Sequence, residues 1–367
     1  MSTSTAIKLM NLPESKTGSG KSASIFLAGI GSVGGTLLKL LEKLRHPDLK
    51  PELIGVCNSH RVIWKSGGEQ NLSPDNLSSG EPMEWQEILR KLRDYHQKPL
   101  IFVDATGSLE VASIYLDLLK EGIHIVTPSK LANSRDQAYF DHLQKASGES
   151  GAGYLFETTV GAGLPVIRTI RDLLNTGDEI IEISGVLSGT MTYIFDQLEE
   201  GQPFSRAVVK ARALGYAEPD PRDDLSGEDV VRKFLILART IGLKIERDEV
   251  KAESLIPEDL RDVDSTTYLQ SIASYDDEWN QRIRNELESR RTLRFSGTLR
   301  DGKIRVGIES VEKKSPLGQL TGTNNLILIR TQRYFDQPMV IQGPGAGKEV
   351  TASGVLSDIL QIMNDKI

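Results

Sequence analysis

The densest cluster of ionisable side chains in this chain lies between Tyr216 and Lys233 and ends at the apolar run 234–238. Within it, Ser226 and Asp229 have the spacing of a capping box, with Asp in the place usually taken by Glu or Gln. We therefore expect a helix to begin at Ser226. In that helix Asp229 and Lys233 lie on one face, because they are four residues apart.

Lys233 is the candidate proton donor or acceptor of this cluster. The plain interpretation is an i,i+4 ion pair with Asp229, worth about 0.3–0.5 kcal/mol if it is exposed. The chemical interpretation is that the apolar run 234–238 desolvates the lysine, which then loses its proton more easily and serves as an acid/base. The pattern of residues alone leaves both interpretations open.

A second motif has the spacing of a dinucleotide-binding loop. It follows the apolar, strand-like run 24–28 and precedes leucines at helical spacing in 36–45. In such a loop the first glycine makes the tight turn, the second lets the backbone approach a pyrophosphate, and the third allows close helix packing. A plain strand-to-helix loop is the alternative, but it does not need three glycines at this spacing. The predicted cofactor-binding residues here are Gly29, Ile30, Gly31, Ser32, Val33 and Gly34.

The type of dinucleotide is indicated by the residues after the second predicted strand. An NAD enzyme usually has an acidic residue there for the ribose, whereas this chain has Asn58 and, three residues later, Arg61. No carboxylate repels a 2′-phosphate, so we predict NADP or NAD as cofactor, with NADP favoured; a solvated surface role for Arg61 is the alternative. Thr106 and Lys130 follow later strands and are predicted at the edge where nicotinamide and substrate meet.

These residues need a doubly wound α/β fold to bring them together. Strands alternate with helices up to about residue 130, which predicts right-handed crossovers and a Rossmann-type parallel sheet. The predicted strands are 24–28, 52–57, 100–104 and 124–127, and the predicted helices are 36–45, 84–96 and 109–121.

The pattern changes after about residue 161. Residues 164–291 are rich in helical sequence, and Asp301-Gly302 predicts a tight hairpin turn within 292–311. Apolar runs at 326–330 and 339–342 extend an antiparallel or mixed sheet. We therefore expect an α/β protein with three parts: a flexible tail (1–24), a dinucleotide-binding domain (25–163 with 344–367), and an α+β domain for substrate binding and dimerisation (164–343).

Composition excludes several classes of protein. The 367 residues are 38% hydrophobic and 26% charged with a net charge of −7, and no apolar run reaches the roughly 18 residues of a membrane span. We expect neither nucleic-acid nor membrane binding. The chain has a single cysteine, Cys57, which cannot form an internal disulfide, so we expect a reducing compartment. We expect the Cys57 side chain to be a small buried apolar group. The predicted location is cytoplasmic, with an organellar stroma left open by the Ser-, Thr- and Lys-rich first residues.

Several long motifs, in the same order, resemble the homoserine dehydrogenase family over about residues 25–365. They are much more specific than the glycine loop alone. The motifs are Val126-Thr127-Pro128-Ser129-Lys130, the run from Glu157 to Pro165, Gly185-Val186-Leu187-Ser188-Gly189-Thr190, the run from Gly215 to Lys233, and Gly343-Pro344-Gly345-Ala346-Gly347.

The resemblance implies reversible, NAD(P)H-dependent interconversion of L-aspartate 4-semialdehyde and L-homoserine, in threonine, methionine and isoleucine synthesis, by a homodimer. It also implies that Lys233 is the proton donor to the aldehyde oxygen and that Lys130 is a second active-site lysine that contacts cofactor or substrate. Gly345 and Gly347 are expected to bring the C-terminal helix back beside the cofactor. The substrate-binding residues that it implies are Glu218, Asp229, Asp224, Gly189, Thr190 and Tyr216.

A monovalent cation, usually sodium, is a further implication. Glu157 and the backbone carbonyls of Val160, Ala162 and Leu164 match the family's cation site. Taken by itself, the spacing favours a glycine-rich hinge with Glu157 in a salt bridge. The sequence also departs from the family: Ala217 stands where Thr is frequent, and we expect the form without aspartokinase or regulatory domains.

Two other functions compete with this one. An aldehyde-oxidising semialdehyde dehydrogenase needs a cysteine nucleophile, and Cys57 is predicted on the adenosine side of the sheet, far from the chemistry. A non-catalytic nucleotide-sensing protein would keep the glycine loop but has no need of the lysines and carboxylates.

Overall fold

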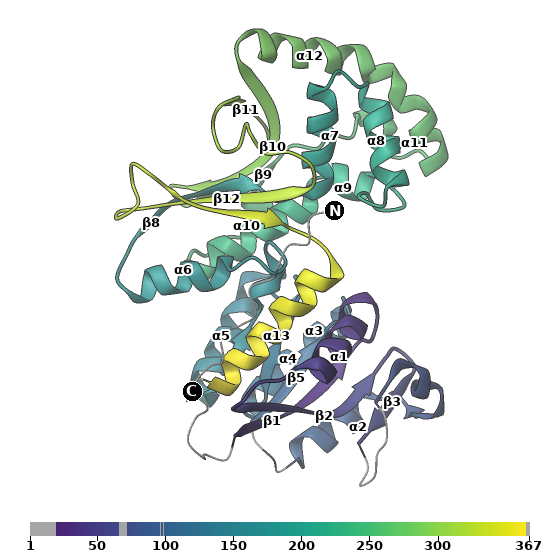
Figure 1. Ribbon diagram of the computed structural model, residues 1–367, viewed down its shortest axis with the longest axis vertical. Coiled ribbons are helices and arrows are strands. Elements are labelled where there is room, and N and C mark those ends of the chain that lie inside the picture. Colours follow the sequence, from purple (N-terminus) through teal and green to yellow (C-terminus); the bar gives the residue numbers. More distant parts are fainter. Residues whose placement is uncertain (1–19, 66–71, 96, 98, 365–367) are drawn as a thin grey trace, which may run out of the picture.

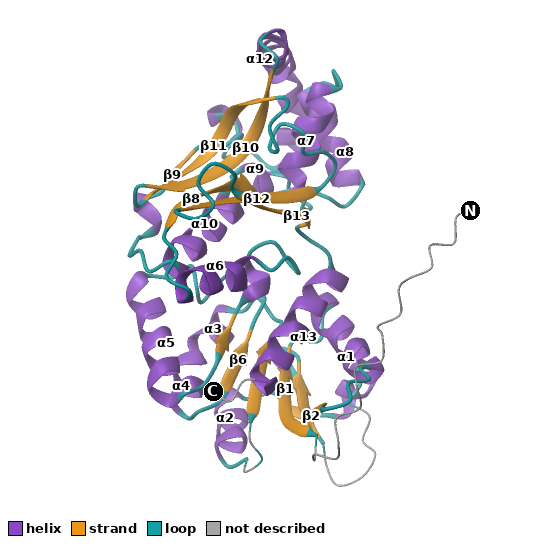
Figure 2. Cartoon of the chain, turned by 60° about the vertical axis from the view of Figure 1, so that its left-hand side comes forward, coloured by secondary structure: helices purple, strands orange, loops and turns teal. Residues whose placement is uncertain are grey.

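The computed structural model describes residues 20–65, 72–95, 97 and 99–364, and these form two sheets with their helices (Figures 1 and 2). The first sheet has the strand order β4-β3-β2-β1-β5-β6-β7. Strands β2, β1, β5, β6 and β7 are parallel, whereas β3 and β4 add an antiparallel edge. This is the Rossmann-type sheet that the alternating pattern predicts.

Helices surround this first sheet, and the last helix of the chain belongs to them. The strands are β1 (Lys21–Ala28), β2 (Leu49–Cys57), β3 (Arg61–Trp64), β4 (Glu81–Pro82), β5 (Leu100–Asp104), β6 (His124–Val126) and β7 (Tyr154–Leu155). The helices are α1 (Ser32–Lys43), η1 (Pro74–Ser79), α2 (Trp85–Arg93), α3 (Leu109–Ser113), α4 (Tyr115–Lys120), α5 (Gln137–Ser150) and α13 (Lys348–Asn364).

The first strand begins earlier than expected. Residues 21–24, assigned to the flexible tail, are the start of β1 and pair with β2. The burial pattern explains the error, because Lys21 and Ser22 are exposed and give no apolar signal. Residues 1–19 of the predicted tail lie outside the described part of the chain.

The second sheet is mixed and has the order β13-β12-β8-β10-β11-β9. Its strands are β8 (Ile180–Val186), β9 (Lys251–Ala252), β10 (Arg291–Arg300), β11 (Lys303–Glu312), β12 (Asn324–Thr331) and β13 (Met339–Pro344). The short turn η2 (Glu157–Thr159) precedes the crossing to this sheet. The helices of the second sheet are α6 (Val166–Asn175), α7 (Gly189–Glu199), α8 (Phe204–Ala213), α9 (Arg222–Leu225), α10 (Glu228–Thr240), η3 (Arg247–Glu249), η4 (Glu258–Leu260), α11 (Ser265–Ser271), η5 (Ile272–Tyr275) and α12 (Asp276–Glu288).

The predicted hairpin is present in the second sheet. Strands β10 and β11 are joined by Asp301 and Gly302, whose φ angles of +51° and +68° are those of a type I′ turn. The sequence pattern missed β8, which lies within the region expected to be helical and pairs with both β10 and β12. Because β8 lies between β12 and β10, the residues Leu187 and Gly189 that follow it lie in the middle of one end of the sheet.

Helix α13 returns from the second sheet to the first, as predicted for the glycines before it (Figures 1 and 2). Its buried residues Val355 and Ile359 share one hydrophobic core with Ile25 and Leu27 of β1 and Val103 of β5. The core of the first sheet is therefore completed by residues more than 200 positions further along the chain. No helix in the described part of the chain has the length and apolarity of a membrane span.

Candidate active site

The glycine turn between β1 and α1 has the geometry of a dinucleotide-binding loop. Gly29 has a φ of +89°, and a side chain on it would strike the backbone of Ala105 at 2.8 Å. A side chain on Gly34 would overlap the carbonyl oxygen of Gly29, so this glycine lets helix and turn meet. Gly31, in contrast, faces open space, with nothing within 4 Å of the position that a Cβ would take.

Helix α1 is open to an anion at its N-terminus. Gly31 is the N-cap and gives no side-chain hydrogen bond, and the first turn carries no acidic residue. The first backbone N–H groups of the helix are then free for a phosphate, and the helix dipole favours a negative charge. The predicted contacts of Ile30, Ser32 and Val33 fall on this same turn.

Asn58 and Arg61 build the turn that follows β2. The Asn58 side-chain oxygen accepts hydrogen bonds from the backbone N–H groups of His60 and Arg61, both at 2.8 Å. The Arg61 guanidinium is exposed and donates to the carbonyl of Gly80 at 3.2 Å. Asn58 thus shapes the turn, and Arg61 keeps further guanidinium donors for a ligand.

A buried polar network, which the sequence analysis missed, supports the loops after β5 and β6. Asp104 accepts hydrogen bonds from the backbone N–H (2.7 Å) and the hydroxyl (2.6 Å) of Thr106, and another from the hydroxyl of Tyr115. The Tyr115 hydroxyl also lies 3.1 Å from the Thr127 hydroxyl, which accepts from the N–H of Ser129 at 2.9 Å. Burial raises the pKa of the Asp104 carboxyl, and these hydrogen bonds oppose that shift.

This network links Thr106 to the residue before Lys130. Thr106 lies against Gly29 of the glycine turn, because its methyl group is 2.9 Å from the position that a Gly29 Cβ would take. The sequence signal that could have revealed this network is Asp104, the one charged residue in the otherwise apolar strand 100–104. The structure shows that this residue holds two loops of the parallel sheet in register at their functional edge.

Lys130, Asp229 and Lys233 come together although Lys130 is about a hundred residues away from the other two. The Asp229 carboxylate lies 2.7 Å from the Lys233 ammonium and 3.2 Å from the Lys130 ammonium. Lys233 is 8% exposed and also donates to the carbonyl of Leu187 at 2.7 Å. The ion pair that the i,i+4 spacing predicts is therefore present, and it contains a second lysine.

The two lysines determine the ionisation of Asp229. Desolvation pushes the pKa of its carboxyl upward, but the ammonium groups of Lys233 and Lys130 outweigh that effect and hold the pKa well below its usual range. The group therefore carries two positive charges and one negative charge. Such a site has a net positive charge available to stabilise an oxyanion.

The capping box predicted at Ser226 and Asp229 is absent. Helix α10 begins at Glu228 with Gly227 as its N-cap and has no side-chain cap. Ser226 is instead the C-cap of the short helix α9, and its hydroxyl donates to the Asp223 carbonyl at 2.9 Å. Asp229 points to the lysines instead, so electrostatic attraction replaces the capping contact.

A second group of predicted residues lies at the N-terminus of α7. The Thr190 hydroxyl is 2.6 Å from the Tyr216 carbonyl and 2.9 Å from Asp224, and Asp224 also accepts from the Glu218 N–H at 2.8 Å. Burial raises the pKa of Asp224. Since α7 starts two residues after Leu187, this group lies close along the chain to the carbonyl that holds Lys233.

Gly189, Tyr216 and Glu218 occupy the surface of this group. A side chain on Gly189 would meet the Thr323 carbonyl at 2.8 Å. The Tyr216 ring is 44% exposed and packs edge-on against Tyr193, with ring centroids 5.1 Å apart. Glu218 is exposed, and its backbone, not its carboxylate, is tied to Asp224.

Glu157 lies apart from the lysines, beneath the start of α6. It is buried, and its two carboxylate oxygens accept hydrogen bonds from the N–H groups of Ile167 (2.7 Å) and Arg168 (2.8 Å). Its own N–H donates to Asp358 of α13 at 3.1 Å. Burial raises the pKa of both carboxyls, that of Asp358 to about 7. The salt bridge expected for Glu157 is replaced by backbone donors.

Cys57 is buried at the end of β2 beneath Gly29. Burial raises the pKa of its thiol to about 12. A thiol in this state is a poor nucleophile, because only the thiolate attacks carbonyl groups. This finding removes the support for a cysteine-dependent aldehyde oxidation.

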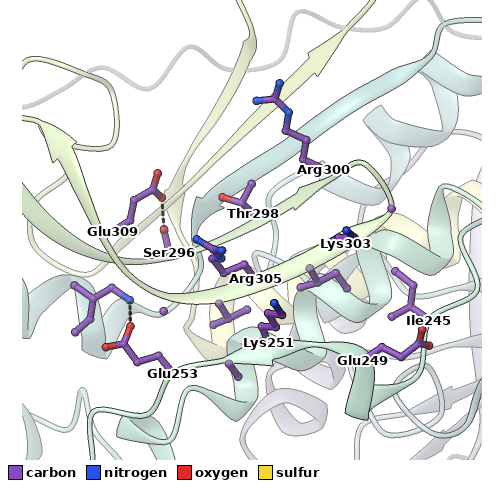
Figure 3. A pocket seen from close by; sticks show the side chains of 16 residues that line it. Ile245, Glu249, Lys251, Glu253, Ser296, Thr298, Arg300, Lys303, Arg305 and Glu309 are labelled. Atoms are coloured by element: carbon purple, nitrogen blue, oxygen red, sulfur yellow. Dashed lines mark hydrogen bonds between the residues drawn. The ribbon is translucent and has the colours of Figure 1, made fainter.

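A cavity lies elsewhere, on the outer face of the second sheet (Figure 3). It measures about 1040 Å³ and is lined by alternate residues of β10, from Ser296 to Arg300, by the continuous run 303–309 of β11, and by β9. Glu309 accepts from Ser296 at 2.5 Å, and Glu253 accepts from the N–H of Ile308 at 3.0 Å. None of the predicted site residues lines this cavity.

A Rossmann-type sheet with an open glycine turn, next to a lysine-aspartate-lysine group, defines a class: the nicotinamide-dependent oxidoreductases. Two family models match the chain in sequence order. The NAD-binding domain of homoserine dehydrogenase matches residues 29–157, and homoserine dehydrogenase matches residues 165–360. The chain therefore belongs to the homoserine dehydrogenase family.

Individual relatives agree with this assignment. A chloroplastic bifunctional aspartokinase/homoserine dehydrogenase 2 of Zea mays is 38% identical over 352 residues, which are 92% of this chain and 38% of that protein. The chain thus spans about two fifths of this curated relative.

Two solved structures match over nearly their whole length. A hyperthermophilic archaeal homoserine dehydrogenase in complex with NADPH has a TM-score of 0.72 at 28% identity and covers 93% of this chain and 97% of its own. A Candida auris protein of unknown function has a TM-score of 0.87 at 34% identity, with 94% and 98% covered.

Proposed function

We propose that this chain catalyses the reversible, NAD(P)H-dependent reduction of L-aspartate 4-semialdehyde to L-homoserine. The observation that carries the proposal is the meeting of Lys233, Asp229 and Lys130 in a protein of this family with an open glycine turn. When bound, the nicotinamide supplies the hydride. The residues of the chain must then hold the substrate and manage one proton.

Lys233 is the proposed proton donor. Asp229 keeps it as an ammonium, and the Leu187 carbonyl fixes its direction, so its remaining hydrogen is available for the substrate oxygen. As the aldehyde carbon accepts hydride, negative charge builds on that oxygen, and the two lysines stabilise it. Proton transfer from Lys233 to the alkoxide completes the alcohol.

Substrate binding is proposed for the acidic group and the start of α7. The carboxylates of Glu218 and Asp229 suit the ammonium of a zwitterionic amino acid, and Lys130 suits its carboxylate or the cofactor. Asp224 supports the group through Thr190 and the Glu218 N–H. Gly189 and Tyr216 line the same place.

The dinucleotide is proposed to be NADP in preference to NAD. The residues fit such a group, because Gly31 leaves open space at an uncapped helix N-terminus. Arg61 supplies a guanidinium and no acid follows β2, which suits a 2′-phosphate. We also propose that Thr106, Lys130, Gly345 and Gly347 border the nicotinamide end.

A monovalent cation, sodium, is proposed at Glu157 with the carbonyls of Val160, Ala162 and Leu164. Support comes from Ala162, whose φ of +52° is rare for a residue with a side chain, and strained backbone is often kept for a ligand. The Leu164 carbonyl already accepts from Val166 at 2.9 Å, so it would share its oxygen. We expect NaCl to raise the melting temperature above the value in choline chloride. Equal melting temperatures would contradict the cation site.

A homodimer is proposed through the outer face of the second sheet. That face carries the cavity of about 1040 Å³ and mixes charges of both signs, including Arg305 and Glu309, which suits pairing with a second copy. Light scattering after size exclusion measures the mass directly. A monomer at micromolar concentration would contradict this proposal.

The decisive experiment is turnover of L-homoserine with NADP and NAD side by side, followed at the absorbance of the reduced cofactor. We expect activity with both and a higher kcat/KM with NADP. Lys233→Ala should lower kcat by a factor of about 10²–10⁴, with NADPH binding retained, whereas Arg232→Ala, at the partly exposed neighbouring position, should keep its activity. Binding of the cofactor without turnover would favour a dinucleotide-sensing protein instead.

A further inference from the structure

Asn325, at the start of β12, is a buried side chain without hydrogen-bond partners. It is 1% exposed, and neither its Nδ2 nor its Oδ1 is paired with any described residue. A buried polar group left unpaired costs roughly 1–3 kcal/mol, and native proteins rarely keep both ends of an amide in that state. The amide therefore needs a partner that the chain itself does not supply.

The surroundings of Asn325 belong to the candidate active site. Leu326 pairs with Val186 in the sheet, so the next residues, Asn325 and Leu187, are neighbours across the two strands. The Leu187 carbonyl is the one that accepts the hydrogen bond from Lys233. On this side, Asn325 is therefore next to the residue whose carbonyl holds the proposed proton donor.

On its other side Asn325 lies against the last glycine turn. It is paired with Gly343 of β13, and a side chain on Gly345 would overlap the whole Asn325 carboxamide. Helix α13 begins three residues after Gly345 and packs against the sheet that carries the glycine loop. The turn over the amide therefore faces the dinucleotide side of the site.

We propose that Asn325 binds the nicotinamide end of the dinucleotide through hydrogen bonds between its carboxamide and the carboxamide of the ring. Two primary amides are complementary, since each offers an N–H donor and a carbonyl acceptor. The glycines at 343 and 345 put no side chains over the amide, so a small movement of their turn opens it to a ligand. This inference rests on the proposed function, because it requires a nicotinamide cofactor.

The charged groups of the substrate are a poorer match for this position. Leu187, Gly343 and Gly345 around the amide are neutral, and an ammonium or a carboxylate placed there would lose its hydration without an opposite charge. The charged partners are Lys130, Lys233 and Asp229, which lie together. A neutral ligand group therefore fits Asn325 best.

The test compares dissociation constants for NADPH and for its 3-acetylpyridine analogue, in which a methyl group replaces the amide nitrogen. We expect the wild type to bind the analogue about tenfold more weakly, the equivalent of one lost hydrogen bond. In Asn325→Leu, which has a similar shape, NADPH binding should weaken until the two constants agree within about twofold. Asn324→Leu is the matched control and should keep the wild-type ratio.

A third ligand separates recognition from folding. This ligand is 2′-phospho-ADP-ribose, which is NADP without its nicotinamide. Wild type and Asn325→Leu should bind it equally. A loss of affinity that is equal for all three ligands would show a structural role and overturn the proposal, as would an unchanged ratio of the two dinucleotides. If Asn325→Leu does not fold, Asn325→Ala makes the same comparison, because its side chain can neither donate nor accept a hydrogen bond.

The binding test of Asn325 and the turnover test of the proposed function can fail independently. Dinucleotide binding without homoserine turnover would contradict the proposed function, while the ratio of constants would still decide the role of Asn325. No dinucleotide binding by the wild type would contradict both proposals.

Discussion

At the scale of single residues, one carboxylate serves two lysines. Asp229 reaches Lys233 from the same helix and Lys130 from the loop after β6. The contact within the helix follows from the spacing of four residues, and the sequence predicted it. The contact with Lys130 depends on how the two sheets meet, and only the family resemblance pointed to it.

Asp229 gives a pH-dependent contribution to stability. Its pKa is lowered in the folded protein, so the carboxylate stays ionised there at a pH where the unfolded chain, with a pKa near 3.8, takes up a proton. Its stabilisation is therefore complete above about pH 5 and is lost as the pH falls below 4.

We expect Asp229→Asn to unfold at lower urea concentration than the wild type at pH 7, with the difference shrinking from pH 5 to pH 3. Urea midpoints across that range measure the effect. A difference that grows on acidification would show the opposite sign. Glu228→Gln, one residue earlier on the same helix, is the control for an exposed ion pair.

The contribution of the buried network to stability can be tested at Asp104. Asp104→Ala leaves the Thr106 N–H, the Thr106 hydroxyl and the Tyr115 hydroxyl without their shared acceptor. We expect a loss of about 2–4 kcal/mol in the free energy of unfolding, because each buried unpaired donor costs about 1–3 kcal/mol. Denaturant titration measures it.

Asp104→Asn separates the two halves of that network. Its amide oxygen can still accept from Thr106, and the Tyr115 hydroxyl can donate to Thr127 instead. The loss should therefore be smaller than for alanine. Equal losses for the two variants would mean that the negative charge, and not the hydrogen bonds, stabilises these loops.

At the scale of elements, the first sheet could be predicted and parts of the second could not. Strands 100–104 and 124–127 and the glycine turn have local signals, because apolar runs end at loops of fixed type. Strand β8 has none that outweighs the helical pattern on both sides, and its partners β10 and β12 lie more than a hundred residues away. The edge strands β3 and β4 were missed for a different reason: with four and two residues they are too short to show a pattern.

The glycine turn yields a prediction that separates folding from ligand binding. Gly34→Ala should lower stability, because its methyl group would overlap the Gly29 carbonyl. Gly31→Ala should fold as well as the wild type, since nothing lies within 4 Å, but should bind NADPH at least tenfold more weakly by closing the approach of the phosphates.

Gly35→Ala is the control for this pair of variants. Its methyl group would be 3.5 Å from the Ile30 carbonyl, an ordinary contact, and alanine favours a helix by about 0.5–1 kcal/mol over glycine. We expect unchanged affinity and a slightly higher melting temperature. Normal NADPH affinity in Gly31→Ala would place the phosphates elsewhere.

At the scale of the whole molecule, the chain leaves the first sheet and later comes back to finish it. Ala352, Val355, Ile359 and Met363 of α13 are buried in the core of that sheet. We expect a fragment of residues 1–164 to show the circular dichroism and proteolysis of an unfolded or loosely packed chain. A cooperative thermal transition in this fragment would contradict the expectation.

A matched variant of the full chain tests the same core from within. Ile359→Ala should cost about 2–5 kcal/mol in the free energy of unfolding, as for other large-to-small changes in cores. Leu360→Ala, on the partly exposed side of the helix, should cost less. Similar losses at both positions would mean that α13 is stabilised by its own helix and not by the sheet.

The return of α13 also determines how the two sheets can move. The chain crosses between them twice, once after η2 and once between β13 and α13. Two rigid units joined by two connections can rotate relative to each other mainly about the line through those connections. We therefore expect any relative motion of the two sheets to be a rotation about that line, which would carry Lys233 of α10 towards or away from Lys130 of the first sheet.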